Sequence, residues 1–168
     1  LYNWLFARHN NGTFILRIED TDLARSTQQA VDAILEAMEW LGLNWDEGPY
    51  FQSKRLELYK EKIDYLLSKG LAYEEKTQRG TAVRFRMKGT SYKTDFEDLV
   101  LGKISCNTEI EDFVIQKSDG FPTFHLANVV DDIDMGITHI IRGNDHVTNT
   151  HKQLALYQAF EKTPPVYA

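Results

Sequence analysis

Polar groups gather in one apolar stretch, residues 122–146, which reads PTFHLANVVDDIDMGITHIIRGNDH. It holds four Asp, two Asn, one Arg and three His in a run that is half apolar. The planar guanidinium of an arginine such as Arg142 offers a fork of N–H donors that a carboxylate can match. A structural ion pair with a nearby Asp is the other use of the same arginine. The rest of the sequence is needed to decide whether these polar groups bind a ligand or serve the packing of the fold.

A second polar cluster, EDTD at residues 19–22, follows an apolar run at residues 14–18 that predicts a strand. The first cluster, RGNDH at residues 142–146, follows another predicted strand at residues 139–141. In an open parallel sheet, ligands bind at the carboxyl ends of the strands. We therefore expect the two clusters to line one crevice.

The elements that position these clusters follow from hydrophobic periodicity. Residues 14–18 are nearly continuously apolar, which predicts a strand covered by helices on both faces. Two amphipathic helices follow, one capped by Ser26 or Thr27 and the next by Ser53. A helix, strand, helix, helix order predicts an α/β sheet. Later in the chain, residues 124–134 predict a short helix, and THIIRG predicts a buried strand ahead of a last helix.

The pattern between residues 71 and 115 is different and predicts a small β-rich insertion. Alternation in TAVRFRMKG predicts a half-exposed strand of an antiparallel sheet. Its apolar face holds Val83, Phe85 and Met87, and its opposite face holds Arg84, Arg86 and Lys88.

Charge and composition restrict the classes of function. The net charge of −6 argues against broad nucleic-acid affinity, but residues 76–93 hold six basic and no acidic residues, so the remainder carries −12. That asymmetry indicates a local site for a phosphate backbone or another anion. The single cysteine, Cys106, excludes an internal disulfide and a Cys-rich zinc site, and it suits a reducing, cytosol-like compartment. No apolar run approaches the roughly 18 residues of a membrane helix.

Four segments carry a family resemblance: FILRIEDTDLARST, WLGLNWDEGPYFQSKRLELY, DFEDLVLGKIS and SDGFPTFHLANVVDDIDMGITHIIRGNDHVTNTHKQLALYQA. They resemble bacterial-type glutamyl-tRNA synthetases, which are class I aminoacyl-tRNA synthetases. The resemblance implies an α/β fold, namely a Rossmann-type catalytic domain with a small β-rich acceptor-arm insertion. On this basis residues 1–70 and 116–168 form the two parts of the catalytic domain, and residues 71–115 form a truncated insertion.

The resemblance also implies roles for the amino-acid-binding residues. Arg142 would read the side-chain carboxylate of glutamate, Glu19 its α-ammonium group, and Asn128 its α-carboxylate. Each has a plainer alternative, such as a surface or helix-capping acid for Glu19. Phe124 lies one turn before Asn128, where the family usually has a tyrosine whose hydroxyl helps to hold the substrate. Losing that donor would weaken glutamate binding by roughly 1.5 to 3 kcal/mol unless water replaces it. The alternative is that Phe124 is simply a core residue.

The nucleotide and tRNA contacts are implied in the same way. The ATP-side residues are Gly143, Asp145 and His146, although Asn144 stands where the family often has Glu and a lone His is more often a surface or cap residue. The tRNA-side residues are Thr21, Asp22 and Arg25 at the 3′ end and Arg84, Arg86 and Lys88 on the acceptor arm. A solvated strand face is the alternative for the last three.

The resemblance implies ATP-dependent ligation of glutamate to tRNA(Glu) through glutamyl-adenylate, with L-glutamate, ATP and tRNA(Glu) as partners and Mg²⁺ as cofactor. The two ATP signature motifs of the family would lie outside these residues, and so would its anticodon-binding region. We therefore expect an internal piece of a longer protein that holds no catalytic residue and is inactive alone. Family members often carry dozens more residues between Glu75 and Lys76, sometimes with zinc-binding cysteines. This sequence has none of these residues, so no zinc is expected here. A cytoplasmic monomer without membrane association is expected.

Two rivals remain. One is a paralogue similar to glutamyl-Q tRNA(Asp) synthetase, which glutamylates a modified anticodon base and tends to differ at Thr21. The other is a catalytically dead RNA- or nucleotide-binding module, which Phe124 and Asn144 would permit.

Overall fold

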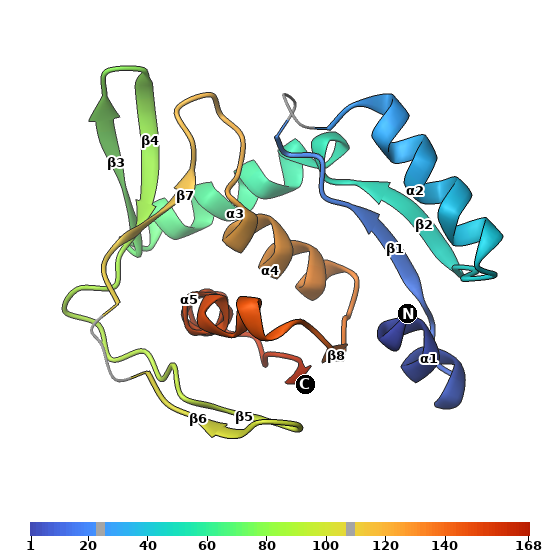
Figure 1. Ribbon diagram of the computed structural model, residues 1–168. Coiled ribbons are helices and arrows are strands. Elements are labelled where there is room, and N and C mark those ends of the chain that lie inside the picture. The colour runs from blue at the N-terminus through green and yellow to red at the C-terminus, as the bar shows by residue number, and fades with distance from the viewer. Residues whose placement is uncertain (23–25, 107–109) are drawn as a thin grey trace. The chain divides into compact units, whose positions relative to one another are not determined.

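The computed structural model describes residues 1–22, 26–106 and 110–168, and Figure 1 shows its elements. The chain divides into two compact units, Leu1–Leu56 and Glu57–Ala168. Each unit is an α/β arrangement with its own sheet pairing, so the predicted fold class is confirmed.

The first unit is built on a parallel pair of strands. Its elements are α1 (Tyr2–His9), β1 (Ile15–Ile18), α2 (Gln28–Trp40), β2 (Glu47–Phe51) and the 3₁₀ turn η1 (Gln52–Lys54). Strands β1 and β2 run parallel, and β2 was not predicted because its sequence, EGPYF, contains glycine and proline. Gly48 has φ +100°, and a Cβ there would clash with the carbonyl oxygen of Leu16, so this strand approaches β1 closely only with glycine.

Two details of this unit correct the sequence predictions. Strand β1 is not buried on both faces, because in the described structure only Ile18 in it is buried and residues 15–17 are half-buried. Ser53 does not cap the following helix, because it lies in η1 and donates from both its backbone N–H and its hydroxyl to the Asp20 carboxylate, at 2.8 and 2.6 Å. Thr27 does cap α2, since its hydroxyl accepts from the Ala30 N–H at 3.2 Å.

The second unit combines three helices with two sheets. Its helices are α3 (Leu56–Ser68), α4 (Phe124–Asp134), the 3₁₀ turn η2 (Asn144–His146) and α5 (Val147–Ala159). Its strands are β3 (Ala72–Thr77), β4 (Gly80–Phe85), β5 (Phe96–Asp98), β6 (Gly102–Ile104), β7 (Phe113–Gln116), β8 (His139–Ile140) and β9 (Val166–Tyr167).

The first of these sheets has the order β3-β4-β7 and is antiparallel throughout. The predicted alternation of burial is present, because Val83, Phe85 and Met87 are buried while Arg86 and Lys88 are exposed. The strand is shorter than predicted, since β4 ends at Phe85 and residues 86–88 follow it outside the sheet ladder. The β3–β4 ladder pairs Glu75 with Ala82 and continues without a break to the turn at residues 78–79. The point where relatives were expected to carry more residues is therefore inside a regular hairpin.

The second sheet has the order β6-β5-β9-β8, in which β9 runs parallel to both β5 and β8. Residues 71–115 thus contribute strands to two different sheets, and the predicted three-part division stays a prediction. Strand β8 is shorter than predicted and is not buried. It occupies the edge of its sheet, where His139 is exposed.

Helix α4 is the centre of the core in this unit and has the predicted bounds. It lies between α3 and α5 (Figure 1), and Leu126, Ala127, Val129 and Val130 in it are at most 1% exposed. The Tyr59 hydroxyl donates its one hydrogen between the two carboxylate oxygens of buried Asp131, at 2.9 and 3.0 Å. Within the parts of the chain that the structure describes, none of the helices has the length and apolar character needed to cross a membrane.

Tyr59→Phe tests whether this buried contact supports the core. We expect the free energy of unfolding to fall by about 1 to 3 kcal/mol, because a buried carboxylate loses its donor. Urea unfolding measures the change. Tyr65→Phe, on the same helix but with a partly exposed side chain, is the matched control and should cost less than about 0.5 kcal/mol. Equal effects of the two substitutions would contradict the assignment.

Candidate functional site

Arg142 emerges directly from the edge of the second sheet. Its backbone N–H donates to the Ala168 carbonyl at 2.9 Å, and the Ala168 N–H donates to the Ile140 carbonyl at 2.9 Å. These bonds continue the β8–β9 ladder past the end of β8. The backbone from which the arginine side chain projects is therefore fixed by β9.

The guanidinium of Arg142 is enclosed but not satisfied. Its side chain is 9% exposed, and its carbon Cζ lies 4.7 Å from the ring centre of Tyr167 and 5.5 Å from that of Phe96. The Asp98 carboxylate is 3.5 Å from Nη2, yet none of the three guanidinium nitrogens makes a hydrogen bond to a described residue. The buried Tyr167 hydroxyl also has no partner among the described residues. Buried donors in native proteins are almost always paired with protein groups or ordered water, so these donors are available to an acceptor that the described residues do not supply.

The electrostatics of Arg142 agree with an anionic ligand. Burial lowers the pKa of Arg142, and the Asp98 carboxylate opposes that effect. An arginine keeps its charge in proteins, so a buried positive fork with free donors remains. A carboxylate matches that fork with two parallel hydrogen bonds. The predicted alternative for Arg142, an ion pair with an Asp, is present with Asp98 at 3.5 Å. This ion pair forms no hydrogen bond with the guanidinium N–H groups.

Asp98 was not among the predicted site residues. Its carboxylate oxygen Oδ1 accepts from the N–H groups of Val100 and Leu101, at 2.9 and 3.0 Å, in the turn of the β5–β6 hairpin. In the sequence an Asp before such a turn indicates an Asx turn and nothing more. Asp98 lies close to Arg142 because β5 pairs with β9. Local sequence patterns do not predict a pairing between segments so far apart in the chain.

Phe124 and Asn128 lie one turn apart on α4 but differ in exposure. Asn128 is 6% exposed, whereas Phe124 is 38% exposed, so the alternative that Phe124 is a core residue is wrong. The Phe124 ring stacks on His146 at 5.9 Å between ring centres. The structure thus brings a residue predicted for the amino acid next to one predicted for ATP.

The segment RGNDH, residues 142–146, connects β8 to α5. Asn144 to His146 make the 3₁₀ turn η2, and the Asp145 side chain is 79% exposed. A Cβ on Gly143 would clash with the Asp145 carboxylate, so glycine permits this placement. His146 lies 3.4 Å from Asp145 and 3.2 Å from the Asn149 side chain. These contacts order the segment and leave the Asp145 carboxylate accessible.

The EDTD cluster directly follows β1, as predicted. Glu19 is exposed and its carboxylate lies 3.4 Å from the Arg17 guanidinium, while Asp20 is tied to Ser53. Thr21 is half-buried and Asp22 is exposed, and Arg25 lies outside the described residues. The crevice predicted to join this cluster with Arg142 stays a prediction.

The basic face of β4 is not uniform. Arg84 lies 3.2 Å from the Glu75 carboxylate and donates to the Asp112 carbonyl at 2.7 Å, so it holds neighbouring strands. Arg86 lies 5.0 Å over the Tyr73 ring and is exposed, as is Lys88. Arg86 and Lys88 therefore have the accessibility that a phosphate contact requires.

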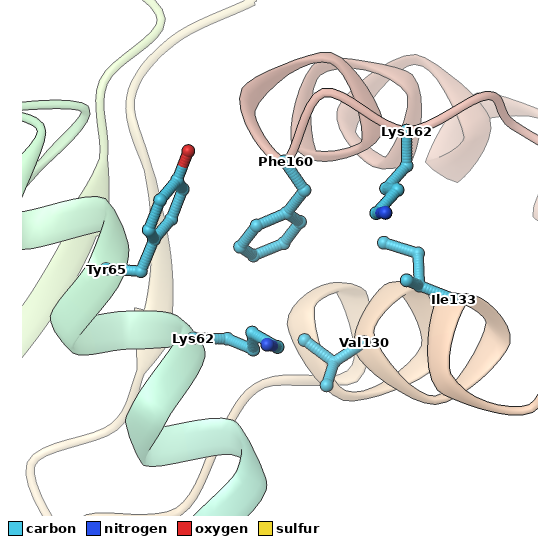
Figure 2. Close-up of a pocket in the computed structure, with 6 residues that line it drawn as sticks. All are labelled: Lys62, Tyr65, Val130, Ile133, Phe160 and Lys162. Atoms are coloured by element: carbon cyan, nitrogen blue, oxygen red, sulfur yellow. The ribbon is translucent and has the colours of Figure 1, made fainter.

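A separate pocket of about 200 Å³ lies among the three helices of the second unit (Figure 2). Its lining residues are Lys62, Tyr65, Val130, Ile133, Phe160 and Lys162, none of which was predicted as a site residue. Among residues 1–22, 26–106 and 110–168, His, Cys, Asp and Glu side chains do not gather in threes as a metal site would require.

The comparisons with known proteins agree with this geometry. The family model for class I tRNA synthetases (E and Q), catalytic domain, matches residues 1–81 and 74–168. The chain belongs to this family. It is 45% identical over 208 residues to glutamate–tRNA ligase 2 of Koribacter versatilis (strain Ellin345), and 46% identical over 201 residues to a glutamate–tRNA ligase of Thermodesulfovibrio yellowstonii. Each of these alignments covers the whole chain.

Solved structures of the family are similar as well. A glutamate tRNA ligase from Elizabethkingia meningosepticum, in complex with its amino acid, superposes on 99% of the chain with a TM-score of 0.91 and 30% identity. The chain covers 44% of that structure and spans about 43% of the length of the curated relatives it matches. The alignments run over 201 to 208 residues, whereas the chain has 168, so these relatives hold residues without a counterpart here. The two family matches meet at residues 74–81, in the β3–β4 hairpin.

His125 is a titratable group at the start of α4, next to Phe124. Its ring makes edge contacts with Phe113 and Phe124, at 5.8 and 5.6 Å between centres. Burial lowers the pKa of His125 from 6.5 to about 4, and the charge of Lys152 adds to the effect. The ring is therefore neutral in the folded protein near neutral pH.

This pKa predicts a loss of stability in acid. Between pH 6.5 and 4 the unfolded chain binds a proton at His125 that the folded protein does not bind, so the free energy of unfolding falls as the pH drops. We expect a loss of about 2 kcal/mol across that window, allowing for the partial exposure of the ring. Urea unfolding at several pH values measures the slope. His125→Gln should flatten it, while His139→Gln, at an exposed histidine, should leave it unchanged; a slope that persists in His125→Gln would refute the assignment.

Proposed function

We propose that this chain is part of the catalytic domain of a glutamate–tRNA ligase that binds glutamate at Arg142. The observation that carries the proposal is the buried Arg142 guanidinium with three nitrogens lacking hydrogen bonds. A glutamate side chain offers two acceptor oxygens to that fork. A glutamine side chain would place an NH₂ donor against it, which leaves a buried donor unpaired and costs affinity. Relatives named glutamate–tRNA ligase support the same substrate.

The remaining amino-acid contacts are proposed from the family resemblance and the burial pattern. Asn128 faces the core of its unit at the turn after Phe124, and it would hold the α-carboxylate of glutamate. Glu19, exposed at the end of β1, would hold the α-ammonium group. Phe124 would contribute a ring face and no hydrogen bond.

ATP would lie against the segment between β8 and α5. The exposed Asp145 carboxylate is able to accept hydrogen bonds from ribose hydroxyls, while Gly143 and His146 would contact the nucleotide beside it. Mg²⁺ would share the charge of the ATP phosphates, and no residue of this chain is proposed as its ligand. The proposed domain division, residues 1–70, 71–115 and 116–168, places this segment in the second part of the catalytic domain.

The reaction asks little covalent chemistry of the chain. The α-carboxylate of glutamate attacks the α-phosphorus of ATP, pyrophosphate leaves, and the terminal adenosine hydroxyl of tRNA(Glu) then attacks the activated carbonyl. Rate enhancement comes from positioning and from electrostatic stabilisation. Arg142, Asn128 and Glu19 would orient the amino acid, and residues 142–146 would orient the nucleotide.

The tRNA would contact two regions. Arg86 and Lys88 are exposed directly after β4 and suit the phosphates of the acceptor arm, whereas Arg84 on β4 is engaged with Glu75 and Asp112. Thr21, Asp22 and Arg25 are proposed for the 3′ end. We also propose that the protein is a monomer and acts in the cytoplasm.

Arg142→Lys in the full-length protein tests the proposed substrate. The lysine keeps the charge but loses the fork, so kcat/KM for glutamate in ATP–pyrophosphate exchange, with tRNA(Glu) present, should fall by roughly 100-fold. Arg79→Lys, the same change in the β3–β4 turn, is the control and should have no effect.

Three results would count against this proposal. Equal exchange with glutamine would remove the role of Arg142 as the reader of the side-chain carboxylate. Absence of exchange by the folded wild-type protein would favour a module that only binds RNA or nucleotide. Glutamate activation followed by transfer to tRNA(Asp) rather than tRNA(Glu) would favour the paralogue.

Lys88→Ala tests the proposed tRNA contact. Loss of one phosphate contact should weaken the binding of tRNA(Glu) whatever the base sequence of its acceptor arm. It should also reduce the slope of log affinity against log salt concentration by about 0.7 to 0.9. Filter binding at several salt concentrations measures both. Lys60→Ala, at an exposed lysine on α3, is the control. An unchanged salt slope in Lys88→Ala would show that this lysine makes no phosphate contact.

A further inference from the structure

We propose that Asp98 is a positioning residue for substrate recognition, which orients the Arg142 fork toward the carboxylate that it binds. The proposal rests on the proposed function, because it takes glutamate as the ligand of Arg142. It adds a residue that belongs to a different segment of the chain and does not touch the substrate itself.

The Asp98 carboxylate is held rigidly before it meets the arginine. Its side chain is 1% exposed, and its oxygen Oδ1 already accepts two backbone N–H groups, those of Val100 and Leu101. The carboxylate therefore cannot rotate without breaking the hairpin turn. The other oxygen, Oδ2, is left facing Nη2 of Arg142 at 3.5 Å.

Two aromatic rings lie against the guanidinium of Arg142. Phe96 lies two residues before Asp98 on β5, and Tyr167 on β9 is the direct strand partner of Asp98. The two ring centres are 5.5 Å apart, and Arg142 Cζ lies within 5.5 Å of both. Because the Leu99 N–H donates to the Tyr167 carbonyl at 2.9 Å, these groups belong to one hydrogen-bonded framework.

The distance between Asp98 and Arg142 decides what Asp98 can do. A bidentate pair at hydrogen-bonding distance would use the donors that a substrate carboxylate needs. At 3.5 Å without a hydrogen bond, Asp98 attracts the cation but leaves its N–H groups available. In a buried setting such an attraction is strong enough to select one orientation of the side chain.

A purely structural role for Asp98, as the cap of the β5–β6 turn, makes a different prediction. In Asp98→Asn the amide oxygen still accepts the Val100 and Leu101 N–H groups, so the turn is kept. The negative charge facing Arg142 is lost. The substitution therefore separates the two roles.

The test measures KM and kcat for glutamate in ATP–pyrophosphate exchange by the full-length protein with saturating tRNA(Glu). For Asp98→Asn we expect KM to rise about tenfold while kcat changes less than about threefold. Asp98→Glu should recover part of the loss. Asp95→Asn is the matched control, since Asp95 lies ahead of the same hairpin, contacts Ser105 and Cys106, and is expected to leave KM unchanged.

The outcomes separate this proposal from the proposed function. A folded Asp98→Asn protein with an unchanged or lower KM overturns the positioning role while glutamate activation stands. Absence of exchange by the wild-type protein overturns the function instead. In that case a structure of the Asp98→Asn protein decides the question without catalysis: a displaced Arg142 guanidinium supports the role, and an unmoved one refutes it.

Discussion

A buried positive charge is the constraint on which the second unit depends. Desolvating a guanidinium is expensive, so the fold has to offset that cost. The chain does so with a carboxylate at 3.5 Å and two aromatic faces, supplied by neighbouring strands of one sheet, and the donors that the proposed ligand would need stay without hydrogen bonds to described residues. The pairing of β5 with β9 therefore supports the surroundings of the proposed site.

Helix α4 serves both the core and the site. Its middle is almost completely buried and packs with α3 and α5, and the Tyr59–Asp131 contact satisfies a carboxylate within that core. Its first turn carries Phe124, which is exposed enough to stack on His146. A helix anchored by its centre is a rigid support for side chains at its end.

The β3–β4 hairpin shows how the insertion is closed in this chain. Relatives hold more residues in their alignments, yet here the two strands pair regularly and turn at residues 78–79. Of the basic side chains on and directly after β4, Arg84 supports this small sheet while Arg86 and Lys88 stay exposed. The regular hairpin thus leaves two accessible cations next to its sheet.

Local patterns alone determined the helices at residues 124–134 and α2 with its Thr27 cap, and the alternation of burial along residues 83–88. These depend on interactions within a few residues, which periodicity and capping rules describe well. The candidate role of Arg142 came from the family resemblance of longer segments. The strand β2 was missed because glycine and proline in it contradict local propensity, and only its partner β1 makes the conformation favourable. Asp98 was missed for the same reason. Its place beside Arg142 arises from a strand pairing between distant segments, and the energy of such a contact is determined by tertiary structure rather than by the residues on either side.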